Sequence, residues 1–264
     1  MNRISERFDT LRSQGETALI TYLTAGDPTL ADTPDLVLAM EEGGADLIEL
    51  GVPFSDPMAD GPVIQAASQR ALKAGANVRA ILDIVYRLRT RTEIPIILMS
   101  YFNPLLQYGL RAFTGDAARA GVDGVIVPDL PLEESGILRE LADANGIALI
   151  PLVAPTSPPD RIGAIAREAR GFIYCVTVKG ITGPRAEMPA NLQYLTSMVR
   201  RSTDLPVALG FGVSGPRQAA QLRDLADGVV VGSALVKFVA EKGMENIKQF
   251  ITFVKELKNA LGKG

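Results

Sequence analysis

The sequence predicts an α/β fold, a single (β/α)8 TIM barrel with an additional N-terminal helix. Eight short apolar segments alternate with amphipathic segments along the chain, and eight strands close a barrel of this type. The apolar segments are almost continuously hydrophobic, as parallel strands covered on both faces are. No change in composition and no low-complexity linker divides the 264 residues. We therefore expect one catalytic domain spanning 1–264.

The predicted elements follow in order along the chain. The strands are expected at 18–25, 45–51, 94–101, 124–130, 148–155, 172–178, 206–213 and 228–233. Helical patterns, several of which end in the common terminator glycine, lie between them, for example at 30–44, 78–91, 133–146 and 214–228. Before the first strand, Ile4, Phe8 and Leu11 are spaced to cover one face of a helix at 4–13. The segment 244–264 has the pattern of a closing amphipathic helix.

The composition, with 47% apolar and 22% charged residues, is that of a soluble globular protein with a sizeable core. A net charge of −3 gives no electrostatic reason to expect nucleic acid or an anionic membrane as a partner. No apolar run is long enough to span a membrane, and residues 1–16 lack the apolar centre of a targeting peptide. The single cysteine, Cys175, is compatible with a reducing cytoplasm, and its apolar surroundings favour a packing role.

The sequence contains no histidine. This absence excludes a Ser-His-Asp triad, a Cys-His relay and a zinc site built from histidines. Acid–base chemistry must therefore use carboxylates, tyrosine, lysine or the substrate itself, and we expect no metal site.

The segment 49–65, "ELGVPFSDPMADGPVIQ", places carboxylates at the end of the second predicted strand and in the loop after it. Active sites of (β/α)8 barrels lie at this end of the strands. A buried glutamate at Glu49 is costly unless it is paired or used in chemistry. A carboxylate that caps a backbone turn is the alternative. For Asp56 and Asp60, local sequence alone favours ordinary turn formation, because Asp-Pro and Asp-Gly pairs are common in turns.

Glycine-rich loops follow the last three predicted strands, at 179–189, 210–215 and 232–238. Barrel enzymes often bind phosphate here through backbone N–H groups and the N-terminus of a short helix. Ser233 could add a hydroxyl donor, and the loop 179–189 is long enough to act as a lid. The three loops together favour a phosphate site over simple turns.

The segment 49–65 and several others resemble the tryptophan synthase alpha subunit (alpha chain) family. The others are "LTAGDP" (23–28), "LMSYFNPLLQYG" (98–109), "VPDLPLEES" (127–135), "KGITG" (179–183), "GFGVS" (210–214) and "VVVGSALV" (229–236). The resemblance implies a barrel that cleaves indole-3-glycerol phosphate to indole and glyceraldehyde 3-phosphate. It also implies no cofactor in this chain, and an α2β2 heterotetramer whose β subunit holds pyridoxal phosphate.

Carried over position by position, the resemblance makes Glu49 and Asp60 the catalytic carboxylates. It implies that the substrate contacts Tyr22, Tyr101, Tyr174, Thr182, Gly183, Phe211, Gly212, Gly232 and Ser233. Of these, Gly183, Gly212, Gly232 and Ser233 match phosphate-binding positions, and the aromatic residues match positions around the indole ring. "TVKGITG" departs from the "SRSGVTG" of well-known bacterial members, which moves a basic side chain to Lys179.

The cleavage chemistry suits the residues independently of the resemblance. In an apolar barrel mouth Glu49 should have a raised pKa, so it could protonate indole C3 and take the proton of the side-chain hydroxyl. Asp60 could stay ionised and accept the ring N–H as positive charge develops.

Three alternatives stay open at this point. Another phosphate-handling barrel would share the late glycine loops, a free-standing lyase would release indole without a partner, and a regulatory subunit would have weak activity of its own. If a β subunit binds, we expect Asp56 and Pro57 to contact it.

Overall fold

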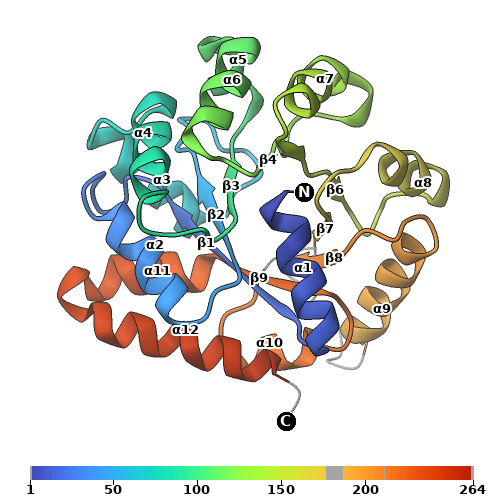
Figure 1. Ribbon diagram of the computed structural model, residues 1–264. Coiled ribbons are helices and arrows are strands. Elements are labelled where there is room, and N and C mark those ends of the chain that lie inside the picture. Colours follow the sequence, from blue (N-terminus) through green and yellow to red (C-terminus); the bar gives the residue numbers. More distant parts are fainter. Residues whose placement is uncertain (1, 177–186, 211, 263–264) are drawn as a thin grey trace.

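The computed structural model describes residues 2–176, 187–210 and 212–262. Its strands are all parallel and form one nine-stranded sheet in the order β5-β4-β3-β2-β1-β9-β8-β7-β6. The strands are β1 (Ala18–Thr24), β2 (Leu47–Gly51), β3 (Ile96–Met99), β4 (Gly124–Ile126), β5 (Ala148–Leu149), β6 (Leu152–Val153), β7 (Ile173–Val176), β8 (Val207–Gly210) and β9 (Gly228–Val231). Helices surround the sheet (Figure 1).

The patterns at 30–44, 78–91, 133–146 and 214–228 correspond to four helices, each shorter than its pattern because the patterns included loop residues. The α-helices of the described residues alternate with the strands along most of the chain. They are α1 (Arg3–Gln14), α2 (Thr33–Glu42), α3 (Pro62–Lys73), α4 (Val78–Leu88), α5 (Phe102–Tyr108), α6 (Leu110–Ala120), α7 (Gly136–Ala144), α8 (Pro159–Glu168), α9 (Glu187–Arg200), α10 (Pro216–Leu222), α11 (Ser233–Lys242) and α12 (Ile247–Leu261), with short 3-10 helices η1 (Leu132–Glu134) and η2 (Met244–Asn246). The predicted opening helix 4–13 is α1, and the predicted closing helix corresponds to η2 and α12.

The fifth predicted strand, 148–155, is divided into β5 and β6. Ile150 N still donates to Val125 O, at 2.9 Å, on the β4 side. The next residue, Pro151, has no N–H to donate, and its carbonyl accepts from Tyr174 N of β7 at 3.1 Å. The two ends of the sheet are thus halves of one strand, which joins β4 to β7 and closes the sheet. The closed barrel predicted from the sequence is confirmed.

Helix α1 closes the N-terminal end of the barrel. Ile4, Phe8 and Leu11 are buried in one cluster with interior residues of the strands, as their spacing predicts. The rings of Phe8 and Phe172 lie 5.6 Å apart. This end of the barrel is therefore filled with apolar side chains.

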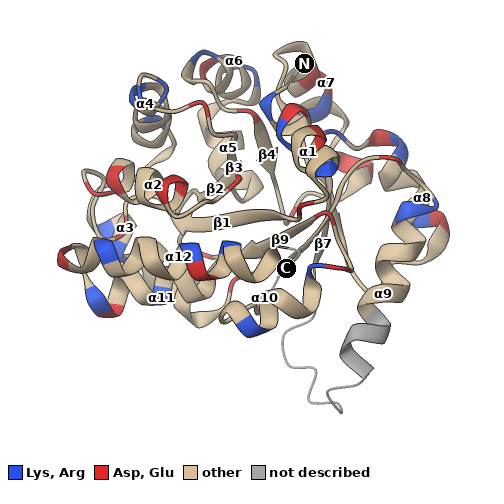
Figure 2. Cartoon of the chain, turned by 60° about the horizontal axis from the view of Figure 1, so that its bottom comes forward, with Lys and Arg blue, Asp and Glu red and all other residues tan. Residues whose placement is uncertain are grey.

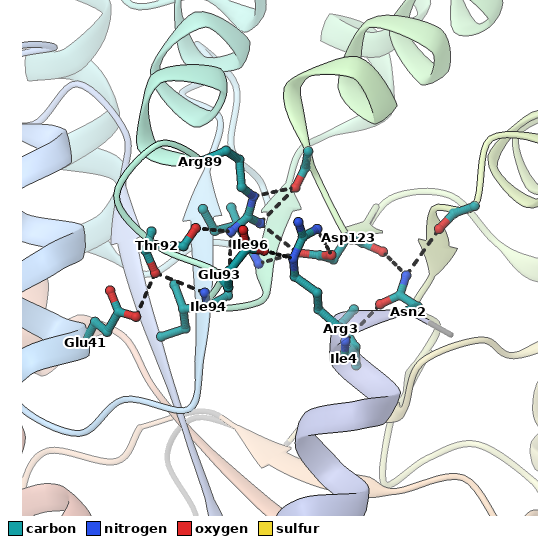
Figure 3. A network of polar contacts seen from close by, with 12 residues as sticks. Asn2, Arg3, Ile4, Glu41, Arg89, Thr92, Glu93, Ile94, Ile96 and Asp123 are labelled. Atoms are coloured by element: carbon teal, nitrogen blue, oxygen red, sulfur yellow. Dashed lines mark hydrogen bonds and ion pairs between the residues drawn. The ribbon is translucent and has the colours of Figure 1, made fainter.

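Aspartates at the starts of three strands fix the backbone around this end. Asp46 accepts Leu19 N at 2.7 Å, Asp123 accepts Ile96 N at 2.9 Å and Asp227 accepts Val207 N at 2.8 Å. The Asp123 carboxylate also forms ion pairs with Arg3 of α1, at 3.1 Å, and with Arg89, at 2.7 Å. Figure 3 shows these contacts. Arg7 of α1 pairs with Asp46 in the same way. The interior of the barrel is therefore closed at this end by α1 and its polar contacts.

The outer surface carries charges of both signs. Basic and acidic residues both occur along α7, α8 and α12 (Figure 2). Within the described ranges, we find no helix that combines the length and the apolar character needed to cross a lipid bilayer.

The packing of α1 predicts a large effect of Phe8→Ala. Phe8 is 3% exposed, and truncating a buried phenylalanine costs about 3–5 kcal/mol. We expect the free energy of unfolding, measured by urea denaturation, to fall by about that amount. Asp9→Ala, at an exposed position of the same helix, is the control and should change it by less than about 0.5 kcal/mol. Equal urea midpoints for the two variants would contradict the conclusion that α1 packs into the N-terminal end of the barrel through Phe8.

Candidate functional site

Glu49 lies inside β2, where it pairs in register with Tyr22 of β1 and Ile97 of β3. It is 1% exposed, and its Oε2 atom has no hydrogen-bond partner among the described residues. Burial, and then the nearby charge of Asp60, raise the pKa of Glu49 to about 8. Its place inside a strand does not fit the turn-capping alternative. The side chain is a carboxylic acid that is largely protonated at neutral pH.

Asp60 lies in the loop between β2 and α3. Its backbone forms a turn, because Asp60 N donates to Pro57 O at 3.0 Å, and its carbonyl accepts Gln65 Nε2 at 2.9 Å. The side chain, however, lines a cavity. Burial raises its pKa to about 6, while a hydrogen bond from Tyr101 acts in the opposite direction. Turn formation therefore accounts for the backbone of Asp60 but not for the placement of its carboxyl group.

Asp56, by contrast, fits the simpler interpretation. It is exposed, its carboxylate accepts the Ser55 hydroxyl at 2.6 Å, and its carbonyl accepts Met58 N at 2.9 Å. These contacts are local turn contacts.

Tyrosines surround the two carboxyl groups. The Tyr22 hydroxyl lies 3.3 Å from Thr24 Oγ1, and burial followed by the charge of Asp60 raises its pKa. Burial and then the charge of Glu49 raise the pKa of Tyr174. Burial and the charge of Asp60 also raise the pKa of Tyr101, to about 12. All three phenols therefore stay protonated and can donate hydrogen bonds.

Two glycines make room for these phenols. A Cβ atom at Gly51 would lie 2.0 Å from the Tyr22 hydroxyl, and one at Gly210 would lie 2.3 Å from the Tyr174 hydroxyl. Any other residue at these strand ends would displace a tyrosine. The sequence analysis did not identify either glycine, although a glycine at the end of an apolar strand is a recognised sign of close approach.

A cavity of about 500 Å³ opens at the C-terminal ends of β3, β4, β6 and β7. Asp60 and Tyr174 line it, and the residues Met99, Val127, Pro128, Leu130, Leu149, Ile150, Leu152 and Val176 give it apolar walls. The cavity also reaches Arg139 of α7 and Arg161 of α8, which the sequence analysis did not single out. An apolar cavity of this size with a few polar groups suits a small organic molecule.

The residues that the sequence analysis placed near phosphate are only partly described. Gly232 and Ser233 lie at the junction of β9 and α11, and Ser233 is the first residue of that helix. A Cβ atom at Gly232 would lie 3.2 Å from the Tyr22 Cβ, so this loop approaches the tyrosine closely. Gly212 is exposed and has φ +75°, which L-residues rarely adopt. Thr182, Gly183 and Phe211, together with Lys179, lie outside the described residues.

Comparison with known proteins identifies the family. The family model for the tryptophan synthase alpha chain matches residues 8–262. The chain belongs to the tryptophan synthase alpha chain family.

Relatives and solved structures agree with this family over the whole chain. The tryptophan synthase alpha chain of Citrifermentans bemidjiense is 52% identical over 265 residues, which cover 100% of this chain and 99% of the relative. That of Caldanaerobacter subterraneus is 49% identical over 97% of this chain and 100% of the relative. A chain of Mycobacterium tuberculosis tryptophan synthase superposes with a TM-score of 0.91 at 37% identity, covering 100% of this chain and 99% of that chain. Membership makes this chain an enzyme subunit of tryptophan biosynthesis.

The burial of Glu49 predicts a pH-dependent stability. A carboxyl group whose folded pKa lies near 8 keeps a proton that the unfolded chain releases at the ordinary glutamate pKa of 4.5. Stability should therefore decline as pH rises from about 5 to 8, and level off above the folded pKa. Glu49→Gln removes this titration, so it should gain about 2–4 kcal/mol relative to the parent protein between pH 5 and pH 9.

Urea denaturation at the two pH values measures this difference. The exposed Glu256 of α12 offers a matched control, because Glu256→Gln removes a carboxylate without altering a buried site. A parallel pH dependence in Glu49→Gln and Glu256→Gln would show that Glu49 does not titrate near neutral pH.

Proposed function

We propose that the chain catalyses the retro-aldol cleavage of indole-3-glycerol phosphate to indole and glyceraldehyde 3-phosphate, as the alpha subunit of tryptophan synthase. The observation that carries the proposal is the pairing of a buried, protonated carboxyl group at Glu49 with the more acidic Asp60 beside an apolar cavity. Family membership supports the same reaction. In this proposal, residues 1–264 form a single catalytic TIM-barrel domain.

Glu49 serves as both proton donor and proton acceptor. Its carboxyl proton is transferred to C3 of the indole ring, which places a positive charge on the ring nitrogen. The carboxylate then takes the proton of the hydroxyl group on the attached carbon. The bond from that carbon to C3 breaks, its electron pair returns to the ring, and the hydroxyl oxygen becomes the aldehyde oxygen. Glu49 ends the cycle protonated, so the proton count balances.

Asp60 stabilises the charge that develops on the ring. When ionised, its carboxylate can accept the indole N–H, and this interaction strengthens as positive charge builds up in the transition state. The hydrogen bond from Tyr101 favours the ionised form. Tyr22, Tyr101, Tyr174 and Phe211 surround the ring in this proposal.

The phosphate group binds across the last loops of the barrel. The N-terminus of α11, at Gly232 and Ser233, offers backbone N–H groups, and anions bind well at such helix ends. Gly212 contributes backbone from the preceding loop, and Thr182 and Gly183 complete the set in this proposal. In this proposal the reaction needs no metal, and, as in its family, the chain holds no cofactor of its own.

The partner in this proposal is a β subunit that holds pyridoxal phosphate and joins indole to serine, in a cytoplasmic α2β2 tetramer. The loop after β2 suits such a contact, since it carries the exposed Asp56 and its neighbour Met58 is 92% exposed. Asp56 and Pro57 are our candidate contacts. A loop that carries both Asp60 and the contact surface would couple this site to the partner.

Substitution of the two carboxyl groups tests the reaction. Glu49→Gln should lower kcat by about 10²- to 10⁴-fold, since there is no histidine to take over proton transfer. Asp60→Asn should also lower kcat strongly, because an amide cannot offset developing charge. Indole release from indole-3-glycerol phosphate is measured, with substrate binding checked by calorimetry. Parental turnover in both variants would reject the proposal and favour another phosphate-handling barrel.

Titration with a purified β subunit tests the partner. We expect association at micromolar concentrations and a marked rise in the slow indole formation of the chain alone. Asp56→Asn should weaken association, whereas Asp9→Asn, at an exposed site on the helix that closes the opposite end of the barrel, should not. Full activity without the partner, together with no association, would identify a free-standing lyase. Very low activity with or without the partner would identify a regulatory subunit.

A further inference from the structure

The loops after β2, β3 and β4 are linked by hydrogen bonds that reach the backbone next to Asp60. Tyr101 directly precedes α5, and its ring packs against Phe54 with the centroids 5.3 Å apart. Its hydroxyl accepts Ala59 N, directly before Asp60, at 2.8 Å. The same hydroxyl lowers the pKa of the Asp60 carboxyl group, so the phenol fixes the backbone next to Asp60 and acts on its carboxyl group.

The backbone around Tyr101 is fixed by hydrogen bonds to its own carbonyl group and to the N–H of the next residue. Phe102 N, at the start of α5, donates to Asp129 Oδ1 at 2.8 Å. The first N–H groups of a helix have no partner within the helix, and a carboxylate at this end is favourable. The buried Ser100 hydroxyl donates to Tyr101 O at 2.9 Å. The direction of the Tyr101 side chain is therefore set by Asp129 and Ser100.

We propose that Tyr101 and Asp129 are positioning residues for the cleavage: Asp129 fixes the start of α5, and the Tyr101 hydroxyl in turn orients the Asp60 carboxylate. This inference rests on the proposed function. It gives the segment 127–135 a role, and it assigns the Tyr101 hydroxyl a task distinct from that of an aromatic wall. Asp129 also lines the cavity, and in this inference it acts through Tyr101.

A shift in pH dependence separates positioning from wall formation. Tyr101→Phe keeps the ring and its packing but leaves Asp60 without the hydrogen bond that favours its ionised form. The pKa of Asp60 should then rise above its present value of about 6. Because Asp60 acts ionised, the acid limb of the kcat profile should move to higher pH, while substrate packing against the ring stays the same.

The experiment compares kcat, KM and the pH profile in four variants. For Tyr101→Phe we expect kcat to fall by roughly 10- to 100-fold, the loss of a hydrogen bond to a charged group, with little change in KM. Asp129→Ala should shift kcat and the acid limb in the same direction, and Asp129→Asn should restore both, because its amide oxygen still accepts Phe102 N. Tyr86→Phe, at a tyrosine 65% exposed on α4, is the control and should match the parent protein.

A substrate-free measurement separates this inference from the proposed function. The ¹³C signal of the Asp60 carboxyl, assigned with Asp60→Asn, is titrated in the parent protein and in Tyr101→Phe. A higher midpoint in Tyr101→Phe supports the inference even if the parent protein fails to cleave indole-3-glycerol phosphate. Unchanged midpoints and an unchanged acid limb, or an effect on KM alone, would overturn it and leave Tyr101 with only the substrate contact that the resemblance implies.

Discussion

The candidate site depends on keeping the Glu49 carboxyl uncharged inside a barrel of apolar strands. An ionised carboxylate without a partner is far more costly to bury than a neutral acid, so burial itself keeps the proton in place. The surrounding groups respect this constraint. The tyrosines near Glu49 stay protonated, and among the described residues the charge that raises the pKa of Glu49 is that of Asp60. The pair thus divides into an acid and a base through environment alone.

The two ends of the barrel treat buried carboxyl groups in opposite ways. At the N-terminal end, Asp46 and Asp123 each accept a backbone N–H. Asp46 also pairs with Arg7, and Asp123 with Arg3 and Arg89. At the C-terminal end, Glu49 Oε2 has no partner among the described residues. Satisfied carboxylates stabilise the fold, whereas an unsatisfied acid keeps its hydrogen-bonding capacity for a ligand. The contrast distinguishes the structural end of the molecule from the reactive end.

Periodicity in the sequence was enough to predict the strands, the closed barrel and the buried face of α1. These features depend on apolar patterning, which is local. The division of the fifth strand was not predicted, although Pro151 lies within it. The missing N–H of Pro151 divides the strand only because residues on one side of it pair with β4 and residues on the other side pair with β7, and this long-range pairing is not visible in the local sequence. Long-range polar contacts were also missed. In the segment 23–28, for example, Asp27 pairs with Arg70, which lies 43 residues away.

Within the candidate site, Glu49 could be identified from its residue type and its position at the end of a buried strand, but Asp60 needed the resemblance, because its local sequence favours a turn. The structure shows that the Asp60 backbone forms such a turn, whereas the residue also lines the cavity, which turn formation does not require. No local signal could have shown that Gly51 and Gly210 face tyrosine hydroxyls, since those contacts cross between strands. Sequence patterns therefore predicted where the site lies better than how its groups are held.

The divided fifth strand separates the barrel into two sets of strands. The strands from β1 to β4 carry Tyr22 and Glu49 and lead into the loops of Asp60 and Tyr101, whereas β7 to β9 carry Tyr174 and lead to Gly232. These sets meet through the β1–β9 ladder and again through the short pairings of β5 and β6. A ligand whose ring and phosphate span the two sets adds a third connection between them. Under the proposed binding mode, bound substrate would therefore also stabilise the closed barrel.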